Sequence, residues 1–478
     1  MPDRQRLIAH LDMDAFYASV ELLRYPELSG LPVVIGGGRR HAPVLEEDPL
    51  TGEPRRVFAR LGDYVGRGVI TTATYPARDF GVRSGMGLMK AARLAPQAVL
   101  LPIDMDEYRR LSRLFKAAVR AIAPLVEDRG VDEIYIDLTD VVGDVDDPWW
   151  AVRDVARAIK AAVKNATGLT CSIGITSNKL LSKIASELDK PDGLTVLRPA
   201  DVEQRIQPLP ASRINGIGPK AYLKLQSFGI VTIADLAARD PAWLVAQFGR
   251  SYGAWLHAAA HGLDDRPVVT SSEPQSISRE TTFERDLHAV RDRAELSALF
   301  TDLCEHLADD LARKRYLSRS IGIKLRFDDF RTVTRVVTLP QATGDAAAIR
   351  RAAGECLKRV DLARRIRLLG VRAEALVAED RLEPDERLPQ QAGASAGKAA
   401  TRRVRPVRGG APSGAAEPSP TDLLATTATL PLFEDLPVPA GPGPAGPEPV
   451  APVPSARVPA ARVPAGPAAK SPPPSDDR

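Results

Sequence analysis

The sequence contains few cysteines, few histidines and no long apolar run. The three cysteines, Cys171, Cys304 and Cys356, lie far apart, and the six histidines show no metal-ligand spacing. This scarcity excludes a disulfide framework and a thiolate zinc site, and it suits a reducing compartment. Because no apolar stretch of 18 residues occurs and no signal region precedes the first predicted strand, we expect a cytoplasmic protein that does not associate with membranes.

The composition is otherwise that of a protein with a substantial core. Hydrophobic residues make up 44% of the chain and charged residues 26%, and a length of 478 residues predicts about three or more domains. The net charge of +4 leans basic. A charge spread over a whole chain is a weak sign of nucleic-acid binding, for which a local basic patch counts more.

The last 96 residues differ from the rest of the chain. They contain 21 of the 41 prolines and a single aromatic residue, Phe433. Such a segment cannot bury enough apolar surface to offset the entropy lost on ordering. We therefore predict that folded structure ends near residue 383 and that a disordered tail rich in Pro, Ala and Gly follows.

Strand and helix patterns alternate over the first 200 residues, which predicts one α/β domain interrupted by a smaller segment around 25–98. Within that segment, residues 39–66 are polar and turn-rich, so we predict a surface excursion. Residues 200–265 are predicted to form short helices. The pattern from Ser276 onward predicts a separate β-α-β-β-α-β module, with elements at 277–283, 290–315, 320–327, 332–339, 345–362 and 367–377.

Two acidic motifs carry the first chemical signal. Asp12 and Asp14 end a predicted strand, where a spacing of two places both side chains on one face. Asp132 and Glu133 lie in a predicted strand over 130–138, and as neighbours they serve one site only if that strand bends. These acids are solvated strand ends unless the motifs converge. Convergent carboxylates would suit two Mg²⁺ ions placed for phosphoryl transfer.

Two further segments supply donors for an anion. Thr71, Thr72, Tyr75 and Arg78 follow a predicted strand into a loop, and their hydroxyl, phenol and guanidinium groups suit a polyphosphate. A packed tyrosine and a surface arginine would give the same pattern. Lys179 and Lys183 lie one helical turn apart, as on a solvated helix face, whereas Lys190 at a helix end is fixed enough to meet an anion.

Four motifs together make the pattern specific, because they occur in the order seen in Y-family DNA polymerases. The chain resembles the bacterial DinB type over roughly residues 6–378, and independent motifs that agree in order and spacing make coincidence very unlikely. The motifs are DMDAFYASVE (12–21), YPARDFGVR (75–83), VDEIYID (131–137) and KPDG (190–193).

The resemblance implies an α+β multidomain fold, arranged as a right-hand polymerase with an additional DNA-binding domain. The implied parts are the palm (1–24 and 99–199), the fingers (25–98), a helix-hairpin-helix thumb (200–268), a linker (269–275), the little finger (276–382) and a disordered C-terminal tail (383–478).

The resemblance also implies roles for the acids. Asp12 and Asp132 match the metal-binding carboxylates, and the Met13 carbonyl matches the backbone ligand. Glu133 matches the catalytic acid near the primer 3′-hydroxyl, where it helps to hold the ion that activates this hydroxyl. Two Mg²⁺ ions are the implied cofactors. Asp14 belongs to the motif, but the family does not use it as a main ligand.

Nucleotide selection and binding are implied next. Tyr17 matches the steric gate, an aromatic ring with which a ribose 2′-hydroxyl would collide. Contacts to the incoming dNTP are implied for Phe16, Thr71, Thr72, Tyr75, Arg78 and Lys190, with Thr71 where the family covers the base. Two departures are mild: Gly130 stands where the family often has Ser, and the 39–66 excursion is longer than usual.

Two regions are expected to hold primer–template DNA. Residues 214–220 (INGIGPK) form a helix-hairpin-helix signature in which Gly216, Gly218 and Lys220 would contact the phosphate backbone; a bare GxG pattern is otherwise often only a tight turn. In the C-terminal module, the basic residues recur at the same strand positions, so we expect them on one face of the sheet. That basic face would follow the DNA phosphate backbone and would not be an ordinary solvated face. These basic residues are Arg319, Lys324, Arg326, Arg331 and Arg335.

The tail contains one apolar cluster, at Leu430, Leu432 and Phe433. It resembles the bacterial sliding-clamp-binding peptide with the pattern Gln-Leu-x-Leu-Phe, except that Thr429 stands where Gln is expected. An isolated apolar run in a disordered arm suits a docking motif.

The sequence therefore predicts an error-prone translesion DNA polymerase that extends primer 3′ ends across damaged or misaligned template by two-metal nucleotidyl transfer. No separate nuclease motif is visible, so proofreading is not expected. We expect a monomer, in the cytoplasm at the nucleoid, that uses dNTPs and a sliding clamp. The rivals are a non-catalytic adaptor for DNA and clamp, which the complete acid set disfavours, and a nucleotide cyclase, which would need neither the hairpin nor the basic module.

Overall fold

A computed structural model describes residues 5–49 and 52–382 of the chain. The predicted tail, with its candidate clamp-binding motif at 429–436, lies outside the described residues. Among those that are described, no helix is long and apolar enough to cross a membrane.

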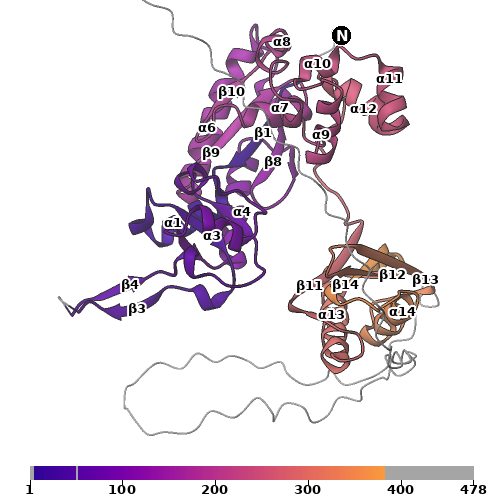
Figure 1. Ribbon diagram of the computed structural model, residues 1–478. Coiled ribbons are helices and arrows are strands. Elements are labelled where there is room, and N and C mark those ends of the chain that lie inside the picture. Colours follow the sequence, from indigo (N-terminus) through magenta and orange to yellow (C-terminus); the bar gives the residue numbers. More distant parts are fainter. Residues whose placement is uncertain (1–4, 50–51, 383–478) are drawn as a thin grey trace, which may run out of the picture. The chain divides into compact units, whose positions relative to one another are not determined.

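A five-stranded mixed sheet forms the core domain, in the order β10-β9-β1-β8-β7 (Figure 1). Helices α4 and α6 pack against each other over one face, and α7 packs on β1 and β9. The elements are β1 (Ile8–Met13), α1 (Phe16–Arg24), α4 (Met105–Arg120), β7 (Val126–Asp128), β8 (Glu133–Asp137), α5 (Thr139–Val142), α6 (Pro148–Thr167), β9 (Cys171–Thr176), α7 (Lys179–Ser186) and β10 (Leu194–Val196).

Strand β1 lies at the centre of this sheet and is covered on both faces. Leu11 and Met13 join the apolar core beneath α4 and α6, whereas His10 points the other way and lies 2.8 Å from Ser186 Oγ of α7. Burial on both faces explains why the strand is apolar almost throughout. An acid in this strand can reach solvent only near its end, where Asp12 lies.

The insert between α1 and β6 has a small sheet of its own, in the order β5-β2-β6. Alternate residues of β2 serve two cores: Val33 and Ile35 pack towards the core domain, and Val34 packs within the insert. The elements are η1 (Pro26–Leu28), β2 (Val33–Gly36), η2 (Arg39–His41), β3 (Val44–Glu47), β4 (Pro54–Val57), η3 (Leu61–Asp63), β5 (Ile70–Ala73), α2 (Tyr75–Asp79), α3 (Leu88–Leu94) and β6 (Val99–Leu101).

One local prediction in these two domains was wrong, and two others are refined by the structure. The predicted surface excursion over 39–66 is confirmed, because β3 and β4 pair as a solvent-exposed hairpin that projects from the insert (Figure 1), although Leu61 behind it is fully buried. Tyr75–Asp79 is a short helix rather than a loop, with Pro76 in its first turn, where the missing N–H has no cost. The strand predicted over 130–138 is confirmed as β8, but it begins three residues later than predicted, because the connection from its hairpin partner β7 includes Gly130 at φ +150°.

Residues 199–260 form a helical region with its own apolar core. Leu180, Leu181 and Ile184 of α7 belong to that core, so α7 is shared between this region and the core domain. The elements are η4 (Pro199–Asp201), α8 (Val202–Arg205), η5 (Ala211–Arg213), α9 (Pro219–Ser227), α10 (Ile233–Ala237), α11 (Pro241–Phe248) and α12 (Arg250–Ala260).

The C-terminal module confirms the predicted order of strands and helices. Its antiparallel sheet has the order β11-β14-β12-β13, and α13 and α14 pack on one face of it. The elements are β11 (Ser276–Leu287), α13 (Arg293–Lys314), β12 (Tyr316–Phe327), β13 (Thr332–Thr343), α14 (Ala346–Lys358), β14 (Ile366–Ala378) and η6 (Glu379–Arg381).

Candidate active site

The two acidic motifs converge, as predicted, at one end of the central strands. Asp12 on β1 is the direct ladder partner of Glu133 on β8. The amide of Met13 donates a hydrogen bond to the carbonyl of Asp132 over 3.0 Å. Asp132 immediately precedes β8 and is therefore outside its strict alternation, which allows two neighbouring acids to serve one site.

Asp14 does not share this site, so the expectation from strand alternation was wrong. Strand β1 ends at Met13, and Ala15 turns the chain with φ +44°. The buried Asp14 carboxylate accepts hydrogen bonds from Ser172 Oγ at 2.8 Å and from the amide of Asp192 at 2.9 Å. Asp14 thus ties the turn after β1 to the start of β9 and to the loop before β10, which agrees with its being no main ligand.

Lysines neutralise two of the three converging carboxylates. Lys190 Nζ lies 2.7 Å from Asp12 Oδ1 and 2.8 Å from Glu187 Oε1. Lys183 forms an ion pair with Glu133, and His10 Nε2 lies 3.4 Å from the same Glu133 carboxylate. A solvated helix face is therefore the wrong explanation for Lys179 and Lys183, whose side chains are only 6% and 23% exposed.

The three carboxylates differ in protonation behaviour. Burial raises the pKa of Asp12 against the opposing effect of Lys190, and burial together with the charge of Glu133 raises the pKa of Asp132. Burial also acts to raise the pKa of Glu133, but hydrogen bonds from His10 and Lys183 outweigh it and lower that pKa to about 2. Glu133 is therefore the acid most firmly held in its ionised form.

The donors at this point fit a hard divalent cation by their chemistry. Carboxylate and carbonyl oxygens, the ligands that Mg²⁺ prefers, are supplied by Asp12, Met13, Asp132 and Glu133. In residues 5–49 and 52–382, no three His, Cys, Asp or Glu side chains are gathered closely enough to hold a metal ion. The ammonium groups of Lys183 and Lys190 instead supply the positive charge that the carboxylates need.

A pocket of about 370 Å³ opens next to these acids, between the core domain and the insert. The core domain contributes Ala15 and six predicted residues, namely Asp12, Met13, Phe16, Tyr17, Asp132 and Lys190, and the insert contributes Thr71, Thr72, Arg78 and Ser84. Ala15 and Ser84 were not predicted. Ser84 directly follows the YPARDFGVR motif, and that position was the only signal that could have found it.

Tyr17 is held rigidly at this pocket. Its ring stacks on Tyr108 of α4, with centroids 4.2 Å apart and planes 11° from parallel. The Tyr108 hydroxyl donates a 2.6 Å hydrogen bond to the buried carboxylate of Glu21. A stacked ring that is fixed from behind presents a hard surface to whatever occupies the pocket. No sequence pattern pointed to Tyr108.

Tyr75 and Arg78 come together on the insert side. The Arg78 guanidinium lies 4.8 Å from the centroid of the Tyr75 ring, and its Nε donates to the carbonyl of Ala73 at 3.1 Å. The Tyr75 hydroxyl is buried without a hydrogen-bond partner among the described residues, and burial raises its pKa, so it stays a neutral donor. A buried hydroxyl without an acceptor suits a ligand oxygen.

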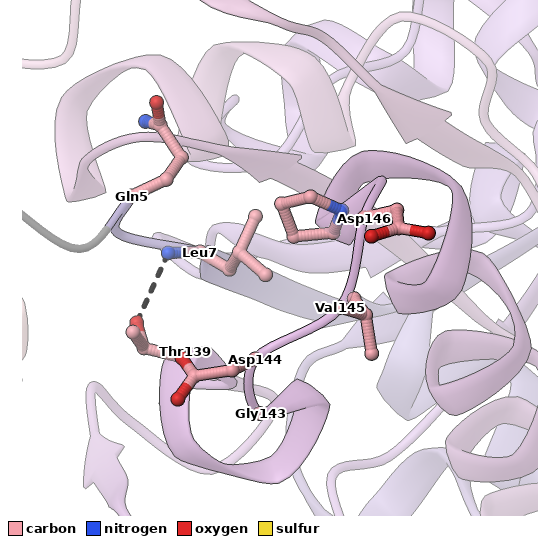
Figure 2. Close-up of a pocket in the computed structure, with 8 residues that line it drawn as sticks. Gln5, Leu7, Thr139, Gly143, Asp144, Val145 and Asp146 are labelled. Atoms are coloured by element: carbon pink, nitrogen blue, oxygen red, sulfur yellow. Dashed lines mark hydrogen bonds between the residues drawn. The ribbon is translucent and has the colours of Figure 1, made fainter.

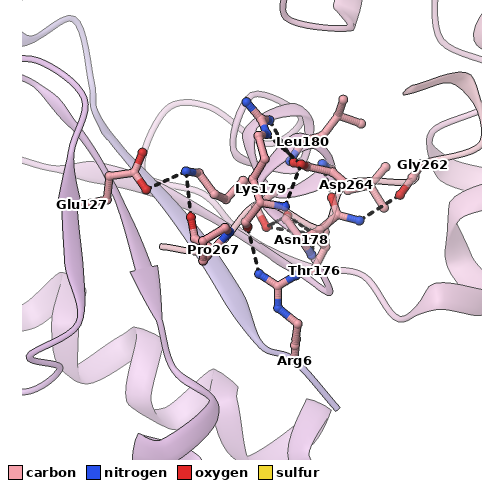
Figure 3. A network of polar contacts seen from close by, with 12 residues as sticks. Arg6, Glu127, Thr176, Asn178, Lys179, Leu180, Gly262, Asp264 and Pro267 are labelled. Carbon is pink, nitrogen blue, oxygen red and sulfur yellow. Dashed lines mark hydrogen bonds and ion pairs between the residues drawn. The ribbon is translucent and has the colours of Figure 1, made fainter. Parts of the chain in front are cut away.

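A polar network holds helix α7 at its N-terminal end (Figure 3). Lys179 Nζ lies 2.5 Å from Glu127 Oε2 and donates to the carbonyl of Pro267 at 3.2 Å. Asp264 accepts the amide of Leu180 at 2.9 Å, and Glu127 accepts the amide of Val269 at 2.8 Å. Residues 262–269, which we call the connecting segment, are therefore hydrogen-bonded to the core domain.

The predicted DNA-contacting hairpin at 214–218 is exposed at its tip and anchored beneath. Ile214 and Ile217 are buried, whereas Gly216, Gly218 and Lys220 are exposed. Gly216 has φ +115°, and a Cβ at this position would lie 2.7 Å from the Trp255 ring, so only glycine fits. The element before the hairpin is the short 3₁₀ turn η5, and the helix after it is α9.

The basic residues of the C-terminal sheet do not share one face, so the predicted single register was wrong. Lys324 and Arg326 alternate with the buried Ile323 and Leu325 and therefore face away from α13 and α14. Arg335 pairs across the ladder with Ile323 and lies on the other face. Arg319 is an odd number of residues from Lys324 on β12, so the two side chains lie on opposite faces of the sheet. Arg331 precedes β13 and lies near the Phe327 ring.

Another pocket lies at the opposite end of β1, as Figure 2 shows. It is lined by Gln5, Leu7, Thr139 and residues 143–146 and 148, and Thr139 Oγ1 accepts the amide of Leu7 at 3.1 Å. None of the predicted site residues borders it.

The chain matches the sequence profile of the impB/mucB/samB family over residues 11–187, and that of the impB/mucB/samB family C-terminal domain over residues 274–386. A protein named DNA polymerase IV from Methanoculleus marisnigri is 38% identical over 376 residues, which are 79% of this chain and 96% of the relative. Another of that name, from Streptomyces coelicolor, is 36% identical over 375 residues, with 77% and 71% covered.

The fold is also found among solved structures. A Y-family DNA polymerase chimera superposes with a TM-score of 0.65 at 24% sequence identity, covering 78% of this chain and 99% of the chimera. At this identity the likeness bears on the fold alone.

Proposed function

Because the chain belongs to the impB/mucB/samB family of Y-family DNA polymerases, with relatives of the DNA polymerase IV type, we propose that its pocket binds the incoming dNTP and its acids direct nucleotidyl transfer. The protein is a DNA-directed DNA polymerase of the translesion type, and its substrates are DNA and dNTPs. The core domain then serves as the palm, the insert as the fingers, the helical region as the thumb and the C-terminal module as the little finger.

In the proposed reaction, the primer 3′-hydroxyl attacks the α-phosphorus of the dNTP and pyrophosphate leaves. Members of this family depend on divalent metal. When bound at Asp12, Asp132, Glu133 and the Met13 carbonyl, two Mg²⁺ ions would supply positive charge for the attacking and leaving oxygens. Because the pKa of Glu133 is about 2, this carboxylate would already be ionised when the primer hydroxyl arrives.

The residues that line the pocket, and Tyr75 beside Arg78, have separate tasks in this proposal. Arg78, Lys190 and the unpartnered Tyr75 hydroxyl would bind the triphosphate, with Thr72 as a further donor. Phe16 and Thr71 would border the nucleotide, and the stacked ring of Tyr17 would exclude a 2′-hydroxyl. Lys190 must exchange Asp12 for phosphate oxygens as the nucleotide arrives.

The observation that carries this proposal is the single pocket in which the Asp12 and Asp132 carboxylates, the Tyr17 ring and the Arg78 and Lys190 cations meet. No nuclease motif accompanies it in the sequence, so we propose synthesis without proofreading. We further propose that the enzyme works as a monomer in the cytoplasm, at the nucleoid, and binds the sliding clamp through Leu430, Leu432 and Phe433.

Primer extension tests the proposal. With Mg²⁺ and four dNTPs, the purified full-length protein should extend primers on undamaged templates and on templates with a single damaged base. It should extend a mismatched 3′ end without first excising it. If the full-length protein binds DNA but extends no primer, the catalytic assignment is overturned. Removal of the mismatched nucleotide before extension would overturn the absence of proofreading.

A further inference from the structure

A small basic pocket lies where the palm, the thumb hairpin and the connecting segment meet. Its volume is about 80 Å³. Four cationic side chains line it, namely Arg129, Lys179, Lys183 and Arg266, and no carboxylate does. Asn215, at the exposed tip of the hairpin, and the ring of Trp255 complete the thumb side.

The four cations are balanced from outside the pocket, and not equally well. Lys179 is held by Glu127 at 2.5 Å and is almost fully buried. Arg129 lies 3.7 Å from the same carboxylate and remains 52% exposed. Arg266 pairs with Asp264 at 2.7 Å and is 59% exposed. The three nearby acids Glu127, Glu133 and Asp264 leave one positive charge in excess. Arg129, whose ion pair is long, can turn towards a ligand, whereas Arg266 is held by two hydrogen bonds to Asp264 and would offer its remaining N–H groups.

These features suit one tetrahedral oxyanion. A volume of about 80 Å³ corresponds to roughly two or three waters at about 30 Å³ each. Guanidinium groups bind phosphate oxygens through paired N–H donors. The ligand is therefore a phosphate group, and it has two sources: a DNA backbone phosphate or a free phosphate such as pyrophosphate.

Two observations favour DNA. Asn215 belongs to the exposed hairpin whose glycines permit close approach of a nucleic-acid backbone. Lys183 lines the pocket and also forms an ion pair with Glu133, the acid assigned to the primer 3′ end. The pocket therefore lies beside the place where the proposed reaction puts the primer terminus.

We propose that this pocket binds a single backbone phosphate of the primer strand close to its 3′ end, with Arg129 and Arg266 as the principal ligands. This assignment rests on the proposed polymerase function. Lys183 then joins two events, because a phosphate in the pocket competes with Glu133 for the same ammonium group. Correct seating of the primer frees the Glu133 carboxylate for its role at the 3′-hydroxyl.

The test combines neutral phosphate analogues with charge-removing variants of the full-length protein. A methylphosphonate replaces one primer phosphate at a time, and DNA affinity is measured for wild type, Arg129→Gln and Arg266→Gln. At one position near the 3′ end, the substitution should weaken wild-type binding but leave both variants unaffected. Each variant should also lower the slope of log affinity against log salt concentration by about 0.9.

Matched controls separate this role from a general loss of charge or fold. Arg157 is an exposed palm arginine paired with Asp154 at 2.7 Å, away from the pocket. Arg157→Gln should keep the wild-type slope and full sensitivity to every methylphosphonate. Arg266→Lys should restore most of the slope, because it returns the charge.

If both variants remain as sensitive as wild type at every position, the pocket does not hold a primer phosphate. If inorganic pyrophosphate raises the melting temperature of wild type but not of the variants, while the DNA data show no coupling, the ligand is a free anion and the DNA assignment is overturned. Wild-type primer extension is measured in parallel. Failure there overturns the polymerase function, whereas failure of coupling with intact extension overturns only the pocket.

Discussion

Charged side chains serve two regions of this molecule in different ways. At the palm acids the charges are half-buried or buried and meet at defined atoms, with Lys190 2.7 Å from Asp12 and Lys183 on Glu133. On the little-finger sheet, Lys324 and Arg326 lie on the face away from the helices, and Lys324 pairs with Glu280 at 2.7 Å with both side chains well exposed.

The two regions differ in how much stability is lost when one charged residue is removed. Removing one partner of a buried pair leaves an uncompensated charge and costs about 3–5 kcal/mol, whereas an exposed pair contributes about 0–1 kcal/mol. Palm residues therefore carry individual tasks. In the proposed function, residues on the sheet would contribute to a summed field along the DNA backbone, in which each is nearly interchangeable with its neighbour.

The largest effect should come from the palm acids. Asp132→Ala and Glu133→Ala should each lower single-turnover nucleotide incorporation by about 10³-fold or more, because charge stabilisation at the reacting phosphate is lost. DNA affinity, measured by fluorescence anisotropy on the same preparations, should change little. If either variant still extends primers, the assignment of an individual catalytic task to that acid is contradicted.

Sugar selection should give the next effect. Tyr17→Ala removes the ring that is stacked on Tyr108, and the preference for dNTP over rNTP, measured as the ratio of kcat/KM values, should fall by roughly 100-fold. Tyr17→Phe keeps the ring and should keep the preference. An unchanged ratio in Tyr17→Ala would show that a residue other than Tyr17 forms the gate.

The little-finger sheet should respond more weakly and through salt dependence. Replacing both Lys324 and Arg326 with Gln should lower the salt slope of DNA binding by about 1.8, which is two phosphate contacts at about 0.9 each. Arg335→Gln is the internal control, because Arg335 lies on the other face of the sheet. An equal effect of Arg335 would contradict the assignment of faces.

The smallest difference between the two regions is expected in their apolar cores, where the buried cysteines should react alike. Burial raises the pKa of Cys171 in the palm and of Cys304 in the little finger to about 12. At pH 8 only about one thiol in 10⁴ is then ionised, and the thiolate is the reactive form. Iodoacetamide should label both residues only after unfolding, as mass spectrometry can measure. Rapid labelling of one alone would mark its domain as the less stable.

Much of the site followed from the sequence because its residues lie in local motifs. Asp12, Asp132 and Glu133 converge as predicted, and the pocket gathers Tyr17, Arg78 and Lys190. Such motifs keep their spacing because short strands and turns position them, and one strand pairing is enough to join the two acidic segments.

The rest depends on packing that no local pattern encodes. Lys179 and Lys183 resembled a solvated helix face, yet α7 lies between the palm sheet and the thumb core, and both ammonium groups meet acids distant in sequence. The face of Arg335 depends on the strand register after a turn, where a shift of one residue moves a side chain to the opposite face. The hairpin β3–β4 is exposed on both sides, so its sequence does not alternate between polar and apolar residues and did not reveal it.

The central claim is that the palm pocket joins nucleotides under the direction of a template. The most direct test offers each dNTP singly to the wild-type protein with a primer facing each of the four template bases, and measures the rate of single-nucleotide incorporation with Mg²⁺. We predict that the complementary dNTP is incorporated fastest opposite every base, with release of one pyrophosphate per addition. Incorporation that does not depend on the template base, or no incorporation by protein that binds the DNA, would contradict the claim.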